Sequence, residues 1–146
     1  MNDKNEVNVL DELNKGCSMG IDAIGYILDK VKNGEFKKVL EIQLNDYKQI
    51  SKEIKKLYPD YSDKKPHETS TMNKIMTFYG IEMKTMTDES DSKLAELLLK
   101  GTNMGIIEGR RLLNHKDTEK DIHSLISEYV KMQEKACEEL KKYINK

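Results

Sequence analysis

The chain has 146 residues, of which 37% are hydrophobic and 35% are charged, and its 25 basic and 26 acidic side chains leave a formal net charge of −1. This length suits one domain, and the near-neutral balance excludes the bulk positive charge that nucleic-acid binding uses. No apolar run exceeds three residues, and the N-terminal sequence MNDKNEVNVLDEL is polar, so we expect neither a membrane-spanning segment nor a secretion signal. Two cysteines 120 positions apart form no disulfide framework, and we expect a cytoplasmic protein.

The first part of the chain predicts two amphipathic helices joined by a short turn. Over 10–31 the apolar or small positions alternate at spacings of three and four, as in a bundle helix: Leu10, Leu13, Cys17, Gly20, Ile24, Ile27 and Val31. Asn33 and Gly34 then predict a stop in the left-handed conformation. A second helix is predicted over 35–57, and it ends because Tyr58 precedes a proline.

A connection of about thirty residues follows. Residues 59–70 are polar and predict a loop, 71–87 predict a Met-rich amphipathic helix, and 87–90 predict the cap of the next helix. Connections this long are uncommon in compact domains unless they cross something, and about seventeen helical residues span roughly 25 Å. We therefore expect an end-to-end crossover, after which the second and third long helices run parallel. The Met-rich helix is expected to cover the bundle, and the alternative is that it lifts and exposes an apolar groove.

The last part of the chain repeats the first. Helices are predicted over 92–114 and 118–144, the latter with a capping box of Thr118 and Asp121. The segment KGCSMGI at 15–21 returns as KGTNMGI at 100–106, and seven of the sixteen positions from 13 to 28 are identical 85 residues later, where chance gives about one. From residue 40 on the offset is 86. The sequence therefore predicts two copies of one helical hairpin.

The duplicated hairpins and the long crossover resemble the ferritin-like four-helix-bundle superfamily, and the KGxxMGI motif is similar to small uncharacterised bacterial domains of that kind. The resemblance implies an all-α bacterial protein with one bundle domain over 1–146. Its first hairpin repeat would cover about 6–58, its crossover about 59–90 and its second repeat about 91–145.

Active members of that superfamily hold two irons with a Glu on each of two helices and a Glu-x-x-His on each of the other two. No Glu of this chain has a His three residues later, and His67, His115 and His123 fall outside the middle of the predicted helices. Asp22 and Glu108 are mid-helix, but Asp22 is expected to point outward and Glu108 to lie on the flank of its helix. We therefore predict no catalytic residues, no metal ligands and no cofactor, and we leave open a surface metal ion at His115 and His123.

The middle of the bundle is predicted to hold two amides and two phenols, Gln43 and Tyr47 on one helix and Tyr129 and Gln133 on another. We expect a satisfied polar layer, with a small polar pocket for a ligand or water chain as the alternative. Glycines recur four residues apart at 16 and 20 and again at 101, 105 and 109. We expect Gly20 and Gly105 at the closest contact between the first and third helices, the alternatives being a ligand groove and a dimer seam.

Three hypotheses for the function follow. The first is a non-enzymatic interaction or assembly module that forms homo-oligomers or binds another protein, without nucleic-acid binding or membrane insertion. The alternatives are a metal-binding redox or storage protein with atypical ligands, and a small-molecule carrier.

Overall fold

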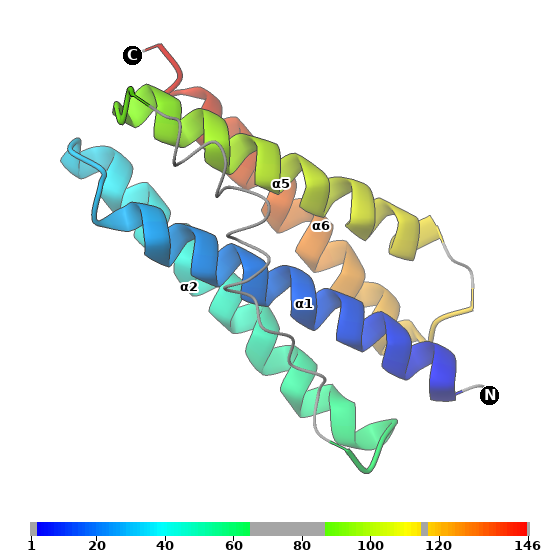
Figure 1. Cartoon of the computed structure of the whole chain (residues 1–146). Helices are drawn as coiled ribbons and strands as arrows, with labels where there is room; N and C mark the ends of the chain where they lie inside the picture. Colours follow the sequence, from blue (N-terminus) through cyan, green and yellow to red (C-terminus); the bar gives the residue numbers. More distant parts are fainter. Residues whose placement is uncertain (1–2, 65–86, 115–116, 146) are drawn as a thin grey trace.

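The computed structural model describes residues 3–64, 87–114 and 117–145, and within these ranges the protein has four long α-helices and no strand (Figure 1). These are α1 (Asp3–Leu28), α2 (Gly34–Leu57), α5 (Asp91–Asn114) and α6 (Lys120–Lys141), with a short 3-10 helix, η1 (Tyr58–Asp60), after α2. The all-α bundle of four helices predicted from the sequence is therefore confirmed. The predicted Met-rich helix, except for residue 87, lies outside the described residues, as do His67 and His115.

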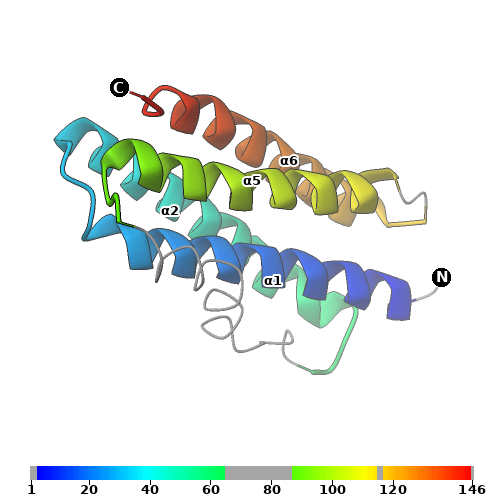
Figure 2. The same cartoon turned by 45° about the horizontal axis from the view of Figure 1, so that its top comes forward.

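The helices form two antiparallel hairpins, α1–α2 and α5–α6, which lie side by side (Figures 1 and 2). The start of α5 lies beside the start of α2, since the Asp91 carboxylate accepts hydrogen bonds from the backbone N–H groups of Lys32 (2.8 Å) and Asn33 (2.7 Å). At the other end the starts of α1 and α6 meet, where the backbone N–H of Glu119 donates to the Glu6 carboxylate (2.9 Å). Helices α2 and α5 therefore run parallel, which confirms the predicted end-to-end crossover.

Two predicted helix ends are wrong. Asn33 is not a left-handed stop: its backbone is extended (φ −76°, ψ 123°), and its side-chain oxygen caps α2 by accepting from the N–H of Phe36 (3.0 Å). No capping box forms at Thr118 either, because α6 begins at Lys120 and the buried Thr118 hydroxyl has no hydrogen-bond partner. Side chains from the neighbouring helices supply local contacts there, which a pattern within one segment does not reveal.

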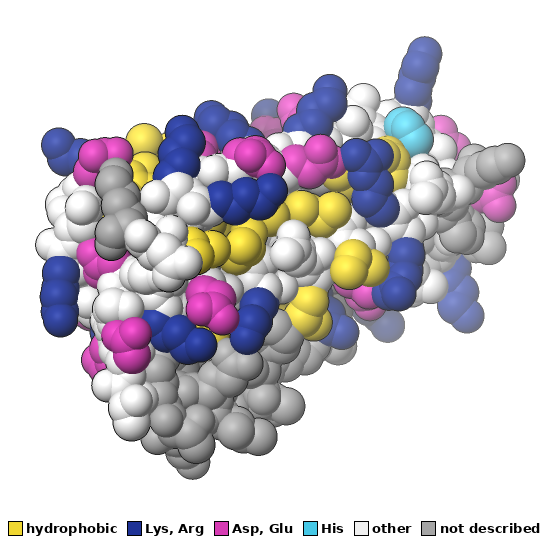
Figure 3. All heavy atoms as spheres, turned by 90° about the horizontal axis from the view of Figure 1, so that it is seen from above, with side chains coloured by type: hydrophobic (Ala, Val, Ile, Leu, Met, Phe, Trp, Pro, Cys, Tyr) yellow, Lys and Arg dark blue, Asp and Glu magenta, His cyan; other side chains and the backbone are white. Residues whose placement is uncertain are grey.

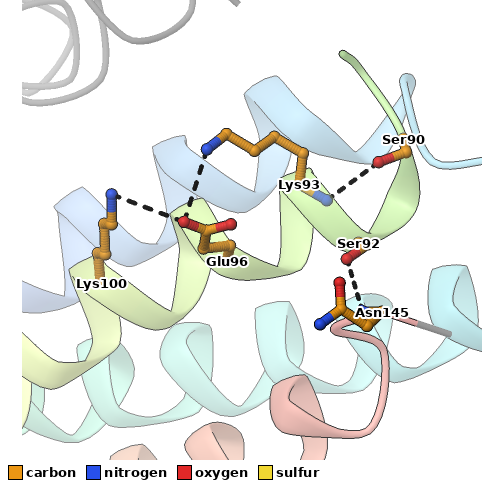
Figure 4. A network of polar contacts seen from close by, with 6 residues as sticks. All are labelled: Ser90, Ser92, Lys93, Glu96, Lys100 and Asn145. Atoms are coloured by element: carbon orange, nitrogen blue, oxygen red, sulfur yellow. Dashed lines mark hydrogen bonds and ion pairs between the residues drawn. The ribbon is translucent and has the colours of Figure 1, made fainter.

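The start of α5 has the predicted cap and also holds the end of the chain (Figure 4). The Ser90 hydroxyl accepts from the backbone N–H of Lys93 (3.3 Å), as in an N-cap, and the Ser92 hydroxyl accepts from the N–H of Asn145 (2.6 Å). The exposed carboxylate of Glu96 pairs with Lys93 (3.5 Å) and Lys100 (3.9 Å). Exposed ion pairs of this kind stabilise little, so the serine contacts fix this corner.

The core is a continuous apolar cluster along the inner faces of all four helices. Each helix contributes side chains that are wholly buried, among them Leu10 and Leu13 on α1, Phe36 and Leu40 on α2, Leu94 on α5, and Ile122 and Ile126 on α6. At one end the Phe36 and Tyr143 rings stack with centroids 4.4 Å apart. None of the described helices combines the length and apolar character that crossing a membrane requires.

Candidate functional site

A cavity of about 380 Å³ lies in the middle of the bundle, between α1 and α5 and above residues of α2 and α6. Its lining is predominantly apolar, with Leu13, Met19, Ala23, Ile24, Leu98 and Leu112 among the contributing side chains. Five glycines also line it: Gly16, Gly20, Gly101, Gly105 and Gly109. Both copies of the repeated glycine motif therefore face one shared space.

The floor of the cavity is the predicted layer of amides and phenols. Gln43 and Tyr47 from α2 and Tyr129 and Gln133 from α6 are all buried and all line the cavity. The Tyr47 hydroxyl donates to the Gln133 side-chain oxygen (2.9 Å). The expected pairing of amide with phenol is confirmed there. The Nε2 atom of Gln43 is buried without a hydrogen-bond partner, so the layer is not fully satisfied.

The glycines do not form the predicted close contact between α1 and α5, and that prediction is wrong. A Cβ atom on Gly20 would lie 2.4 Å from Cζ of Tyr47, and one on Gly105 would lie 3.0 Å from the side-chain amide of Gln133. Each glycine thus makes room for a polar side chain of the opposite helix in its own hairpin. The cavity is lined by these glycines and by other residues of α1 and α5.

Tyr129 spans this space from α6. A Cβ on Gly16 of α1 would lie 2.4 Å from the Tyr129 hydroxyl, and a Cβ on Gly109 of α5 would lie 3.3 Å from its ring. Burial raises the pKa of Tyr129 well above its usual value, so the phenol is neutral near pH 7. Burial likewise raises the pKa of the Cys17 thiol to about 12. The centre of the bundle is therefore uncharged.

The charged residues that line the cavity belong to its mouth. Glu12 and Glu108 are exposed and Lys15 is half-buried, and the Glu108 carboxylate accepts a hydrogen bond from Arg111. Glu108 thus lies on the flank, as predicted, while Asp22 is half-buried and outside the lining. The sequence does not identify Glu12 and Lys15 as lining residues, because a helical pattern does not show which polar positions border an opening.

The residues at the centre do not fit a di-iron site. Such a site needs carboxylates and imidazoles that project inward one turn apart, whereas the buried polar side chains that line this cavity are two amides, two phenols and the hydroxyl of Thr102. Within 3–64, 87–114 and 117–145, no three His, Cys, Asp or Glu side chains lie close enough together to hold a metal ion. His123 is exposed at the start of α6. The donor set favours neutral ligands over hard cations.

Comparison with known proteins supports the fold. No family model and no curated protein matches the sequence. Among solved structures, the chain is similar to the dodecameric thioferritin described as the bacterioferritin-related protein of Bacteroides fragilis, with a TM-score of 0.76 over 98% of this chain and 86% of that one, at 9% identity. The protein has the ferritin-like four-helix-bundle fold.

Proposed function

We propose that the protein is a non-enzymatic bundle that binds a small neutral molecule in the cavity between α1 and α5. The observation that supports this most is the cavity itself, since small-molecule sites are concave, mostly apolar and few per protein. A volume of about 380 Å³ lies within the range of ligand pockets, and a mainly apolar lining with a few polar groups is typical of them.

The choice of residues supports the same proposal. A glycine inside a helix costs roughly 1 kcal/mol relative to alanine, so the five lining glycines together cost several kcal/mol. Three of them, Gly16, Gly20 and Gly105, make room for Tyr129, Tyr47 and Gln133 of the polar layer, and Gly109 lies against Val130 and Tyr129. Apolar side chains in place of this layer would fill the bundle more cheaply, so a binding role accounts for it better than a purely structural one.

The likeness to a ferritin-like protein suggests iron storage as another function. The residues of this chain argue against an internal di-iron centre, because iron ligands in such centres are anionic or imidazole groups and the floor of the cavity has neither. We therefore favour the small-molecule hypothesis over the metal hypothesis.

A thermal-shift screen of small neutral compounds tests the proposal, because a ligand that binds the native state raises Tm. Ala23 is buried and lines the cavity, so Ala23→Leu should fill part of it and abolish the shifts. Gly25→Leu is the matched control, since it adds the same side chain two residues away, where a Cβ meets open space. Shifts that are equal in Ala23→Leu and Gly25→Leu would contradict binding in the cavity.

Self-association is a second candidate function. Large apolar side chains are exposed on α2 and α5, with Ile42 at 55%, Ile107 at 52% and Met104 at 45% of their full exposure. On the face seen in Figure 3, apolar side chains lie among basic and acidic side chains. The similar Bacteroides fragilis protein is a dodecamer. Light scattering after size-exclusion chromatography should show an oligomer that Ile107→Lys weakens, and a monomeric wild type would refute this candidate.

That the protein is bacterial and cytoplasmic stays a prediction.

A further inference from the structure

The side-chain amide of Gln43 has a buried N–H donor without a hydrogen-bond partner. Its residue is 5% exposed, it lines the cavity, and Nε2 has no hydrogen-bond partner. Buried donors are almost always bonded, and leaving one unbonded is unfavourable. This amide therefore identifies a point in the cavity where an acceptor atom is missing.

We propose that Gln43 recognises the carbonyl oxygen of a neutral ligand with an apolar body, an inference that rests on the proposed binding function. In this arrangement the Nε2 N–H of Gln43 donates to the ligand oxygen, while the rest of the ligand lies between α1 and α5.

The neighbouring polar groups point to an acceptor. The Tyr47 hydroxyl is used as a donor to the Gln133 side-chain oxygen. This bond joins α2 to α6 at the cavity floor and does not involve Gln43, whose Nε2 N–H stays without a partner. A neutral oxygen acceptor satisfies it, and a carbonyl oxygen does so without a hydrogen of its own that would need a further buried partner, as a hydroxyl would.

The charges around the cavity favour a neutral ligand. The floor has no cationic group for a carboxylate or phosphate, and the buried Tyr129 phenol is held neutral. At the mouth, Glu108 is paired with Arg111, and the remaining charged lining residues, Glu12 and Lys15, have opposite signs, so the described residues there give no net attraction for an anion. A cation would lose its water at the floor without gaining an anionic partner, and burying an unpaired charge is strongly unfavourable.

The walls favour an apolar body. Leucine and isoleucine side chains come from both hairpins, Leu13 and Ile24 from α1 and Leu98 and Leu112 from α5. Met19 and Met104 occupy equivalent positions in the two copies of the repeat and both line the cavity. Thioether side chains are flexible and pack well against aromatic rings, so a phenyl ketone is a suitable probe.

The experiment compares three probes of the same size: acetophenone, cumene, in which a methyl group replaces the carbonyl oxygen, and benzoate, in which the methyl group becomes a second oxygen and adds a charge. Binding to the whole chain is measured by NMR titration. Wild type should bind acetophenone about three- to tenfold more tightly than cumene, the factor that one net hydrogen bond supplies, and should not bind benzoate.

Gln43→Leu removes the donor and keeps a side chain of similar length, so the preference for acetophenone over cumene should vanish. Gln49→Leu, on the exposed face of the same helix, is the control and should keep it. In wild type, acetophenone should also shift the Gln43 side-chain amide resonance and cumene should leave it unchanged, which decides the matter even if Gln43→Leu does not fold.

The outcomes separate this inference from the function on which it rests. Equal binding of acetophenone and cumene, with an unchanged Gln43 amide resonance, overturns the role of Gln43 and leaves cavity binding intact. Tighter binding of benzoate overturns the preference for neutral ligands. Failure of acetophenone and cumene alike to bind overturns both proposals.

Discussion

Gly20 and Gly25 lie in the same helix and should respond to alanine in opposite directions. Alanine is better than glycine inside a helix by up to about 1 kcal/mol, and both substitutions gain from this. At Gly25 a Cβ meets nothing within 4 Å, so Gly25→Ala should stabilise the protein by about that amount. At Gly20 the new Cβ would lie 2.4, 2.5 and 2.8 Å from Cζ, Cε1 and Cδ1 of the Tyr47 ring, closer than any Cβ contact that proteins tolerate.

The ring of Tyr47 cannot move away freely, because its hydroxyl is bonded to Gln133 in the buried layer. Overpacking of this kind costs about 1 to 3 kcal/mol, so Gly20→Ala should be destabilising by about 0 to 2 kcal/mol after the helix gain is subtracted. For a chain of this size the change in Tm is roughly 2 to 4 °C per kcal/mol. Urea unfolding and calorimetry of the two variants measure the difference. If Gly20→Ala were as stable as Gly25→Ala, the glycine would not be making room for Tyr47, and our account of the glycine motif would be refuted.

Three further predictions follow from the centre of the bundle. Protein loaded with Fe(II) and then desalted should retain far fewer than the two irons per chain of a di-iron centre, and elemental analysis showing two would contradict the neutral donor set. Above about pH 10 the unfolded chain loses tyrosine protons that the buried Tyr129 keeps, so the free energy of unfolding should fall as pH rises. This fall should be less steep in Tyr129→Phe. Equal slopes of the two proteins in urea unfolding would contradict the burial of the Tyr129 phenol. Mild oxidation of the monomer should not join Cys17 to Cys137. Tyr129 lies beside Gly16, and Cys137 is eight residues, about 12 Å, further along α6, whereas a disulfide needs Cα atoms within about 7 Å. Mass spectrometry that showed this bond would contradict the parallel placement of α1 and α6.

The sequence predicts the helices and their topology well because both depend on local patterns. The 3–4 spacing of apolar residues places the inner face of the first helix, and positions that it selects, such as Leu10, Cys17 and Ile27, are fully buried. The length between the hairpins predicts the crossover, which the contact of Asp91 with the start of α2 confirms.

The sequence predicts the site less completely, because its properties depend on distances between helices. Glycines four residues apart are compatible both with close backbones and with room for a bulky side chain, and which of these occurs at Gly20 depends on where α2 places Tyr47. Similarly, helical position places Gln43 in the polar layer. That its N–H lacks a partner depends on how the side chains of two helices meet, with Tyr47 bonded to Gln133. The predictions at Asn33 and Thr118 are wrong because other helices contact those turns. Asp91 accepts from the N–H of Asn33, and Glu6 accepts from the N–H of Glu119.

We propose that the cavity between the two glycine motifs binds a small neutral molecule. An NMR titration of the isotope-labelled protein with acetophenone tests this binding, with the backbone amides of the glycines as the readout. The five glycines that line the cavity should shift together, whereas Gly25 and Gly34, where a Cβ would meet open space, should stay unchanged and serve as controls within the same spectrum. Shifts at Gly25 and Gly34 as large as those at the lining glycines, or no shift at any of them, would contradict it.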